Sequence, residues 1–253
     1  MKNLYKKEKT QKWKNKEQNL KKLFVCGKNS VFDAIKNGFN LEKIFVNNEV
    51  LAHKIKKYGN FDIETKDETF FLDFKDINHQ GIVAFLKEFP IHDLQVIQKD
   101  KPNFVLMLDK IQDPHNLGAI IRTANALGIK HIIMTKEKSA DITSSVLKIS
   151  SGGFIGMKII KSANLVSSIK KLKEFGYWIY ASALSEKAKE LDDVNYNFPI
   201  CLIVGNEGDG VSLPVLKQAD ELIYIKQYGT VQSLNVSVAT GILLNSIVKK
   251  GNE

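Results

Sequence analysis

The sequence predicts an α/β protein in which a small α/β domain precedes a larger domain built on a parallel sheet. Two observations support this prediction. From Asn103 onward, strands rich in valine, isoleucine and leucine alternate with helical segments, a pattern typical of a parallel sheet covered on both faces. Residues 23–89 show a shorter series of strands and helices. With 253 residues, 43% of them hydrophobic, the chain can build a core in each part.

The elements of the small domain follow from turn and capping signals. "LFVCGKNSVFDAIKNG" predicts a short strand, a turn over residues 27–30 and a helix that ends near Gly38. Farther along, "LEKIFVNN" predicts a second strand, "EVLAHKIKKYG" a helix and "GIVAFLKEF" a late strand. These elements end near Phe89, and the stretch is long enough for a small domain.

Residues 90–102 are predicted to be a linker, because they are bounded by prolines and lack a clear hydrophobic period. Residues 103–253 form the larger domain. Its expected strands are "FVLMLDKI", "HIIMT", "YWIYASAL", "CLIVGNE" and "ELIYIK", and its expected helices are "LGAIIRTANALG", "NLVSSIKKLKEFG", "VSLPVLKQAD" and "LNVSVATGILLNSIVKK". Because parallel sheets bind ligands at the carboxyl ends of their strands, "DKIQDPHNLG" and "GNEGDGVS" are the expected ligand loops.

The positive charge is concentrated at the amino terminus. The net charge is +9, and residues 1–22 hold nine lysines and two glutamates, so they carry +7 and the remaining residues only +2. Such a basic, flexible tail is suited to nonspecific contact with phosphates. Its composition is equally typical of a solubilising disordered tail, and the sequence leaves both interpretations open.

The composition favours a cytoplasmic protein without metal or disulfides. No apolar run is long enough to span a membrane, and the first residues lack the hydrophobic core of a signal peptide. Cys26 and Cys201 fit neither a disulfide framework nor a zinc spacing, so we expect two buried or free thiols. The five histidines share no spacing that suggests a metal site, although His79 and His115 lie in loops where they contact either RNA or the turn itself.

Arg122 is the only arginine among 37 lysines and arginines. Arginine differs from lysine in its planar fork of five donors, which binds phosphate or carboxylate through two hydrogen bonds at once. Where lysine serves nearly every cationic position, a retained arginine indicates a position that needs this fork. A structural role, such as binding helix carbonyls or a buried carboxylate, is an equal alternative when Arg122 is considered alone.

Two further segments carry polar residues next to apolar ones. "VGNEGDGVS" has glycines at 205, 208 and 210, which permit tight turns and close backbone approach to a ligand. It is not a P-loop, because no Gly-Lys-Ser/Thr follows. "IKQYGTVQSLNVSVATGILL" introduces Ser233, Asn235 and Ser237 into an otherwise apolar helix. Taken singly, each segment is explained by turn chemistry or helix capping.

Taken together and in order, "NLGAIIRTA", "GNEGDG" and "SLNVSVA" resemble the three motifs of the SpoU branch of knotted RNA methyltransferases. The resemblance continues through "KISSGGFIGMKI" and "NLVSSIKKLKEFGYWI". In the first domain, "GKNSVFDAI" and "HQGIVA" resemble the ribosomal-protein-like substrate-binding domain of bacterial ribosomal RNA guanosine 2′-O-methyltransferases. The whole resemblance covers about residues 23–248, so the basic tail is the part of the chain that it leaves out.

The resemblance implies a carboxyl-terminal domain with a deep trefoil knot, an exception to the rule against threaded chains. It implies a homodimer formed through that domain, with S-adenosylmethionine held by backbone groups around Gly205, Ile225 and Leu234, and no metal. It further implies transfer of a methyl group to the ribose 2′-hydroxyl of a guanosine in large-subunit ribosomal RNA. Modification of transfer RNA or of another ribosomal nucleotide is the alternative, and a silent RNA-binding assembly factor is a third.

The resemblance also implies roles for five side chains. Arg122 would lie at the nucleophile, as a phosphate clamp or as a base, and the difficulty of deprotonating guanidinium favours the clamp. Asn116 would orient Arg122 or the ribose, and Glu207 would fix its loop and pair with Arg122 or a neighbouring donor. Ser233 and Asn235 would lie against the methionine end of the cofactor and the ribose.

One position departs from the family pattern. Members of this branch commonly have Ile-Pro-Met before the last motif, where this chain has Ile225, Lys226 and Gln227. Loss of the proline frees a backbone N–H and loosens φ at that point. The Ser-Leu-Asn core is intact, so the change affects the expected geometry of the cofactor loop more than the expected activity.

Overall fold

The computed structural model of the protein describes residues 22–75 and 77–251. The predicted basic tail, residues 1–22, falls outside this part of the chain except for Lys22. The chain divides into two compact units, Met1–Pro90 with Ile142–Lys148 and Ile91–Asp141 with Ile149–Glu253. Each unit has a sheet of its own, which agrees with an α/β fold in two parts.

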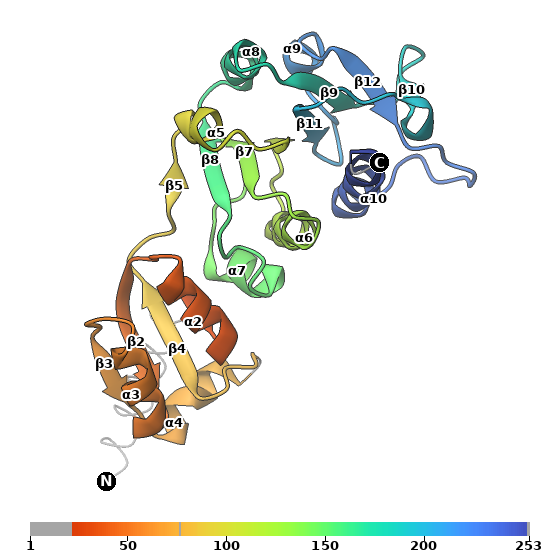
Figure 1. Ribbon diagram of the computed structural model, residues 1–253. Coiled ribbons are helices and arrows are strands. Elements are labelled where there is room, and N and C mark those ends of the chain that lie inside the picture. The colour runs from red at the N-terminus through yellow and green to blue at the C-terminus, as the bar shows by residue number, and fades with distance from the viewer. Residues whose placement is uncertain (1–21, 76, 252–253) are drawn as a thin grey trace. The chain divides into compact units, whose positions relative to one another are not determined.

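The first unit contains a four-stranded sheet in the order β1-β4-β2-β3 (Figure 1). Its strands are β1 (Phe24–Cys26), β2 (Leu41–Val46), β3 (Ile63–Thr65) and β4 (Ile82–Leu86), and its helices are α2 (Lys28–Lys36), α3 (Glu49–Lys56), α4 (Glu68–Phe71) and the 3₁₀ turn η1 (Leu72–Phe74). β4 pairs antiparallel with both β1 and β2, whereas β2 and β3 are parallel. The predicted strand, helix, strand, helix and late strand are therefore confirmed, and β3 and α4 are additional.

One face of this sheet is covered by an aromatic cluster. Phe24, Phe45 and Phe85 come from three strands and pack edge to face, with ring centres 5.5–6.1 Å apart for the pairs that include Phe85. Helix α4 and η1 add further rings, and the buried members of the cluster are Phe24, Phe45, Phe71, Phe74, Val83 and Phe85. Edge-to-face contacts of this kind stabilise a small core beyond the area they bury.

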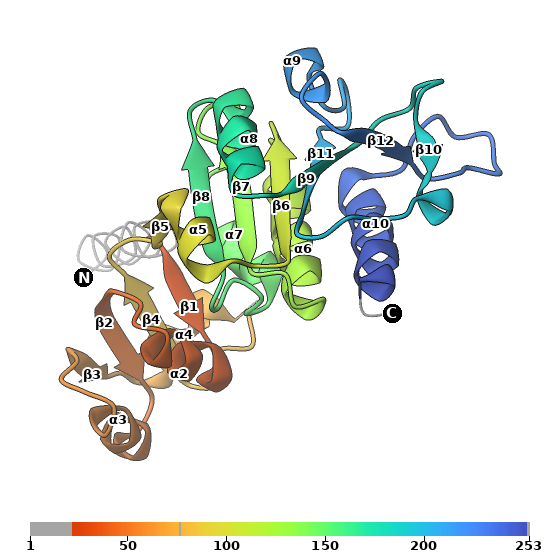
Figure 2. The ribbon, with the colours of Figure 1, turned by 45° about the horizontal axis from the view of Figure 1, so that its top comes forward.

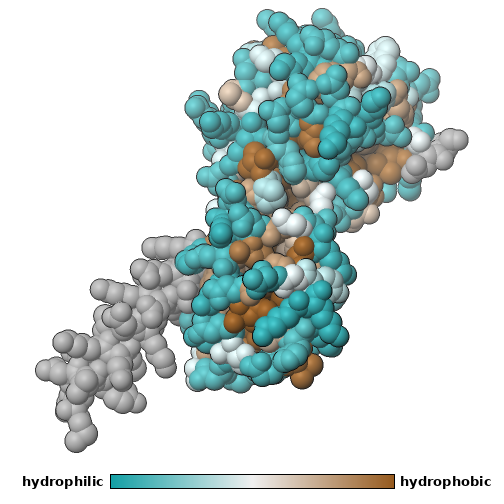
Figure 3. Space-filling view, turned by 60° about the vertical axis from the view of Figure 1, so that its left-hand side comes forward, coloured by the Kyte–Doolittle hydropathy of each residue, from teal (hydrophilic) through white to brown (hydrophobic). Residues whose placement is uncertain are grey.

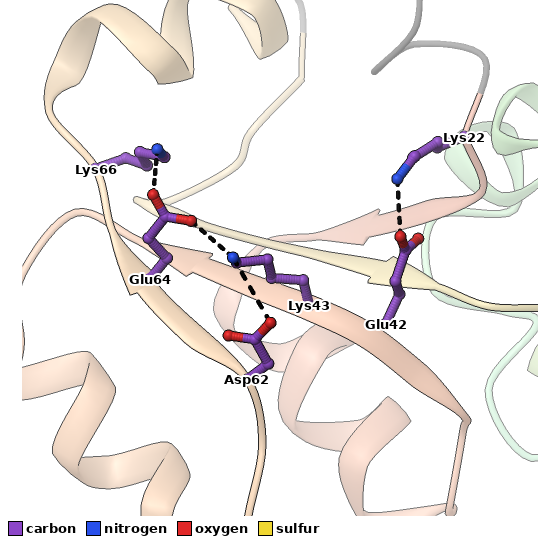
Figure 4. A network of polar contacts seen from close by, with 6 residues as sticks. All are labelled: Lys22, Glu42, Lys43, Asp62, Glu64 and Lys66. Carbon is purple, nitrogen blue, oxygen red and sulfur yellow. Dashed lines mark hydrogen bonds and ion pairs between the residues drawn. The ribbon is translucent and has the colours of Figure 1, made fainter.

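Charged residues near this cluster are paired with one another (Figure 4). The Lys43 ammonium lies 2.9 Å from a Glu64 carboxylate oxygen and 3.6 Å from one of Asp62, and Lys66 binds the other Glu64 oxygen. Hydrogen bonds from the two lysines lower the pKa of Glu64, and the bond from Lys66 contributes most. Exposed pairs of this kind contribute little stability. Their consequence is electrostatic, because the carboxylates of Asp62 and Glu64 balance the charges of Lys43 and Lys66.

The second unit is built on an eight-stranded sheet in the order β10-β12-β9-β11-β6-β7-β8-β5. Every pair of neighbouring strands is parallel, and Figure 2 shows the arrows of β6 and β8 running in the same direction. The strands are β5 (Ile91–His92), β6 (Phe104–Asp109), β7 (His131–Thr135), β8 (Lys158–Ser162), β9 (Trp178–Ser182), β10 (Lys189–Glu190), β11 (Ile200–Gly205) and β12 (Glu221–Tyr224). The predicted parallel sheet is confirmed.

Helices cover both faces of this sheet (Figures 1 and 2). They are α5 (Gln95–Asp100), α6 (Pro114–Ala126), α8 (Leu165–Glu174), α9 (Leu213–Leu216) and α10 (Val236–Lys250), with the 3₁₀ turn η2 (Leu191–Asp193). Most of α7 (Ser144–Ser150) belongs to the segment grouped with the first unit. Ile97 of α5, Leu172 of α8 and Val215 of α9 share one core with the strands, while α6 packs against α10. Strands covered on both sides explain the near-continuous apolar runs in the sequence.

The structure corrects the predicted linker. Residues 91–100 form β5 and α5, β5 pairs with β8, and Ile97 is fully buried in the core of the second unit. The sequence pattern was misleading because β5 has only two residues and α5 only six, too few to display a hydrophobic period.

The surface and the cysteines fit the composition. The face drawn in Figure 3 is mostly hydrophilic, with separate brown hydrophobic areas between hydrophilic ones. Over the described residues, no helix has the length and apolar character needed to cross a membrane. Cys26 and Cys201 are both free thiols, as expected, and Cys201 is buried.

Candidate active site

The glycine-rich segment folds into a closed loop directly after β11. Gly210 donates its backbone N–H to the carbonyl of Asn206 at 3.1 Å, and the Asn206 side chain accepts from the backbone N–H groups of Gly208 and Asp209 at 2.9 and 2.8 Å. A Cβ atom on Gly205 would lie 1.9 Å from the carbonyl carbon of Gly210. Glycine at 205 is therefore required for the loop to close on itself.

A buried carboxylate ties the far end of this loop to β6. Asp109 is 1% exposed, and its Oδ2 accepts a hydrogen bond of 2.8 Å from the backbone N–H of Ser212. Asp109 also stands opposite Gly205 in the pairing of β6 with β11. Both ends of the loop are consequently fixed at the carboxyl ends of two adjacent strands, where open parallel sheets bind ligands.

The amino termini of two helices meet the same loop. α6 begins after Asp113, whose carboxylate accepts from the His115 backbone N–H, and Pro114 fits the first helical turn. α10 begins after Asn235, whose Oδ1 accepts from the backbone N–H of Ser237 at 2.9 Å and from its hydroxyl at 2.6 Å. Helix amino termini carry partial positive charge, so this edge of the sheet favours anionic groups.

Three side chains from distant segments form one hydrogen-bond chain here. Asn235 donates from Nδ2 to Asn116 Oδ1 at 3.0 Å, and Asn116 donates from its own Nδ2 to Glu207 Oε1. Asn116 is 7% exposed, so its amide is largely shielded from water. The first, second and third motifs of the sequence are thereby connected through a single amide group, with Glu207 held in a fixed position.

A cavity of about 350 Å³ adjoins this chain, within the range typical of small-molecule sites. Five segments line it: the end of β9 with Ser182, Ala183 and Leu184; the loop after β11; Leu216 of α9; the segment from Tyr224 to Leu234; and the first turns of α10. Apolar walls come from Leu216, Val236 and Leu243, and Glu207 and Asp209 place carboxylates at the same cavity. The lining combines close backbone, apolar surface and negative charge.

The structure brings most of the predicted site residues together. Gly205, Glu207, Ile225, Ser233 and Leu234 line the cavity. Of the other members, Asn116 joins the cavity wall through its hydrogen bond to Glu207, and Asn235 is bonded to Asn116. Residues missed from the sequence are Ala183 and Leu184 and the loop anchor Asp109. Their signal was positional, since each of them lies at or after the carboxyl end of a strand.

Arg122 lies apart from this arrangement. It is exposed and does not line the cavity, and its side chain forms no hydrogen bond or ion pair with the residues at 22–75 and 77–251. Asn116 and Glu207 bind each other and not Arg122. Arg122 follows Asn116 by six residues, which rotate the chain by about 240° around the axis of α6, so the two side chains leave the helix on different faces. The guanidinium is therefore available to a ligand outside the cavity.

The two loop histidines differ. His79 accepts from the backbone N–H of Gly81 through Nδ1 at 3.0 Å, and its ring stacks on Phe71 with centres 5.1 Å apart. His79 therefore stabilises its own turn, which is one of the two roles that the sequence allows for it. His115 is exposed and contributes its backbone N–H to the cap of α6. Among the described residues no group of three or more histidine, cysteine or acidic side chains is placed to hold a metal.

Comparison with known proteins agrees with this geometry. Residues 103–245 match the model of the SpoU rRNA Methylase family, and this range contains all the site residues described above. The chain belongs to this family. A Staphylococcus haemolyticus protein assigned to the TrmH family of tRNA/rRNA methyltransferases is 31% identical over 242 residues, covering 91% of this chain and 97% of that protein.

Two solved structures show the same fold. The AdoMet-bound rRNA methyltransferase of Sinorhizobium meliloti has a TM-score of 0.78 at 26% identity, covering 92% of this chain and 88% of that one. The TrmH/SpoU tRNA modifying enzyme of A. aeolicus has a TM-score of 0.55 at 35% identity, covering 59% of this chain and 76% of that one. The protein is an S-adenosylmethionine-dependent RNA methyltransferase of the SpoU family.

The cavity fits that cofactor by its chemistry. S-adenosylmethionine combines a flat adenine, an uncharged ribose and a positively charged sulfonium, and it supplies an activated methyl group when bound. Leu216, Leu234 and Leu243 offer apolar contact, and the closed loop around Gly205 brings backbone groups to the ligand. The carboxylates of Glu207 and Asp209 complement the sulfonium charge.

Proposed function

We propose that the protein transfers a methyl group to the ribose 2′-hydroxyl of a guanosine in large-subunit ribosomal RNA. The observation that carries this proposal is the hydrogen-bond chain from Asn235 through Asn116 to Glu207, which joins all three family motifs beside the cavity. A chain of this kind fixes side chains in advance of substrate binding, and in-line methyl transfer depends on such alignment.

The residues have complementary tasks in this reaction. The cavity holds the methyl donor, and Glu207 and Ser233 stand at its wall, where they can bind the incoming hydroxyl. Asn116 and Asn235 keep Glu207 in position. Proximity supplies most of the required acceleration, because the methyl group is already activated when the substrate arrives.

Arg122 binds the RNA phosphate next to the reacting ribose. Its exposure and its lack of protein partners in the described part of the chain support this clamp role over a structural one. Two parallel hydrogen bonds to a phosphate require a guanidinium, which explains arginine in a chain that otherwise uses lysine. Action as a base is disfavoured by the very high pKa of guanidinium groups.

Ribosomal RNA is favoured over transfer RNA by the extent of the similarities. The rRNA methyltransferase of Sinorhizobium meliloti aligns over 92% of this chain, whereas the tRNA modifying enzyme of A. aeolicus aligns over 59%. The difference is about the size of the first unit, for which we propose the role of an RNA substrate-binding domain. The relative from Staphylococcus haemolyticus bears both RNA classes in its name, so transfer RNA remains the second candidate.

We further propose a cytoplasmic homodimer formed through a knotted second unit, without metal. Val238 and Ile242, four residues apart on one face of α10, are 52% and 40% exposed, and an exposed apolar pair of this kind suits a contact between copies. The trefoil knot is a prediction from the family resemblance. Sedimentation of the purified protein at several concentrations tests the dimer.

The deciding experiment is transfer of labelled methyl from S-adenosylmethionine to RNA prepared from a strain that lacks this protein. Wild type and Arg122→Lys are assayed in parallel, and the product nucleosides are analysed. We expect label in 2′-O-methylguanosine of large-subunit RNA, and a loss of most activity in Arg122→Lys.

Other results lead to different conclusions. Label in transfer RNA would move the substrate to the second candidate. Equal activity in Arg122→Lys would retain the enzyme and refute the phosphate clamp. RNA binding without transfer to any RNA would favour a silent assembly factor.

A further inference from the structure

An exposed aromatic side chain directly follows a lining residue of the cofactor cavity in the chain. Ile225 and Gln227 line the cavity, and the next residue, Tyr228, is 87% exposed, the highest value among the large hydrophobic side chains of the described chain. A ring with this exposure contributes little to packing within the protein. Its face is available to a ligand that approaches the cavity from outside.

A lysine holds this ring in place. The Lys226 ammonium lies over the Tyr228 ring, 5.6 Å from its centre, and the same ammonium lies 3.2 Å from a carboxylate oxygen of Glu190. Attraction between a cation and an aromatic face is worth little at an exposed site, yet it is enough to bias orientation. Because the ammonium approaches one face and is tied to β10, the opposite face of the ring stays open.

Exposed apolar side chains occur at the cavity and in the segment that carries the ring. Leu184, which lines the cavity from the end of β9, is 69% exposed, and Val231, three residues after Tyr228, is 63% exposed. An exposed apolar rim around a cavity indicates a binding surface. A ligand suited to this rim has a flat apolar face and polar edges.

We propose that Tyr228 is a stacking platform for an unpaired nucleobase next to the ribose that receives the methyl group. This inference rests on the proposed RNA methyl transfer and deepens it, because it names the substrate class as a single-stranded loop or bulge. Bases in such segments are splayed out and stack on aromatic side chains, whereas bases in a duplex have no free face. The open face of Tyr228 and the apolar rim of the cavity match that chemistry.

The test compares Tyr228→Leu, Tyr228→Phe and the control Trp178→Leu with wild type. Trp178 is a suitable control because it is 46% exposed and begins β9, at the opposite end of that strand from the cavity residue Ser182. Initial rates of methyl transfer are measured against the concentration of large-subunit RNA at saturating S-adenosylmethionine. RNA affinity is measured by filter binding at several salt concentrations, cofactor affinity by calorimetry and oligomeric state by sedimentation.

We expect Tyr228→Leu to raise KM for RNA and its Kd about 5- to 100-fold, the usual effect of removing one stacking ring. The salt dependence of RNA binding should stay unchanged, since stacking releases no counterions, whereas loss of a phosphate contact lowers the slope by about one. Tyr228→Phe, which keeps the ring face, and Trp178→Leu should remain close to wild type. Cofactor affinity should be unaffected in all three variants.

Three results would overturn the inference: unchanged RNA affinity in Tyr228→Leu, an equal loss of cofactor affinity, or a changed sedimentation coefficient that assigns the ring to contact between copies. Failure of the proposed function is separate, since it appears as absence of methyl transfer by wild type. In that case RNA affinity alone still decides whether Tyr228 binds a base.

Discussion

Replacing single glycines of the 205–210 loop by alanine should give three different results from the same chemical change. At Gly205 the new methyl group would lie 1.9, 2.0 and 2.2 Å from backbone atoms of Gly210 and Val211. Contacts between such atoms are normally about 3.5–4.0 Å, and backbone cannot rotate aside as a side chain can. Gly205→Ala must therefore force the two ends of the loop apart by more than about 1 Å.

The energetic cost follows from this displacement. Overpacking costs typically about 1–3 kcal/mol, and a clash with three backbone atoms belongs at the upper end. For a chain of this size, about 3 kcal/mol corresponds to an unfolding temperature lower by about 6–12 °C. If the loop opens to relieve the clash, stability is partly recovered and the cavity is lost. Either way, we expect S-adenosylmethionine to bind at least about tenfold more weakly.

The other two glycines serve as matched controls within the same loop. Gly210 has a φ of +66° and open space around its Cα, so Gly210→Ala should cost only the strain of a left-handed residue, about 1–2 kcal/mol. Gly208 has its nearest neighbour, Asn206 Oδ1, at 3.4 Å from the added carbon, an ordinary contact. Gly208→Ala should change stability by less than about 0.5 kcal/mol.

Calorimetric titration with S-adenosylmethionine and thermal unfolding measure both quantities for the three variants. The reasoning predicts the order Gly205→Ala, Gly210→Ala, Gly208→Ala from the most to the least affected. If Gly205→Ala bound the cofactor within twofold of wild type and unfolded at the same temperature, the closed loop would not be the structure in solution. Equal losses at all three positions would show that any side chain in the loop is harmful, and would refute the argument from individual contacts.

Three further predictions concern other contacts. Asn116→Ala leaves Glu207 without its donor and should reduce methyl transfer at least about tenfold while costing about 1–3 kcal/mol of stability; wild-type kinetics in this variant would remove the hydrogen-bond chain from the mechanism. The Lys250 ammonium donates to the backbone carbonyls of Leu191, Asp192 and Val194. Lys250→Met should therefore lower the free energy of unfolding in urea by about 1–3 kcal/mol, and an unchanged urea midpoint would contradict this. Burial lowers the pKa of His131 below its usual value near 6.5, although the hydrogen bond to Asp100 opposes the shift. As the pH falls, His131 is therefore protonated at a higher pH in the unfolded chain than in the folded one. The free energy of unfolding should accordingly decrease as the pH drops below about 6.5. His131→Gln should flatten this pH dependence in urea unfolding curves, and an identical slope would assign it to other groups.

The sequence by itself determined much of this protein. Apolar runs separated by helices predicted the parallel sheet, because strands buried on both faces need no polar alternation. Apolar periodicity predicted both α6 and α10, but their ends less exactly: the expected segments begin at Leu117 and Leu234, whereas the helices begin at Pro114 and Val236. The motifs predicted the candidate site residues, and their place after strands predicted the edge of the sheet at which most of them gather.

Other features depend on contacts between distant residues. The sequence pattern predicts a linker where β5 and α5 form, because two-residue and six-residue elements are ordered by the core around Ile97 and not by their own pattern. The sequence offered Arg122 as a partner for Glu207, yet the rotation of α6 directs Asn116 there instead. Side-chain partners 91 and 119 residues apart are set by helix rotation and strand register, which only the folded chain fixes.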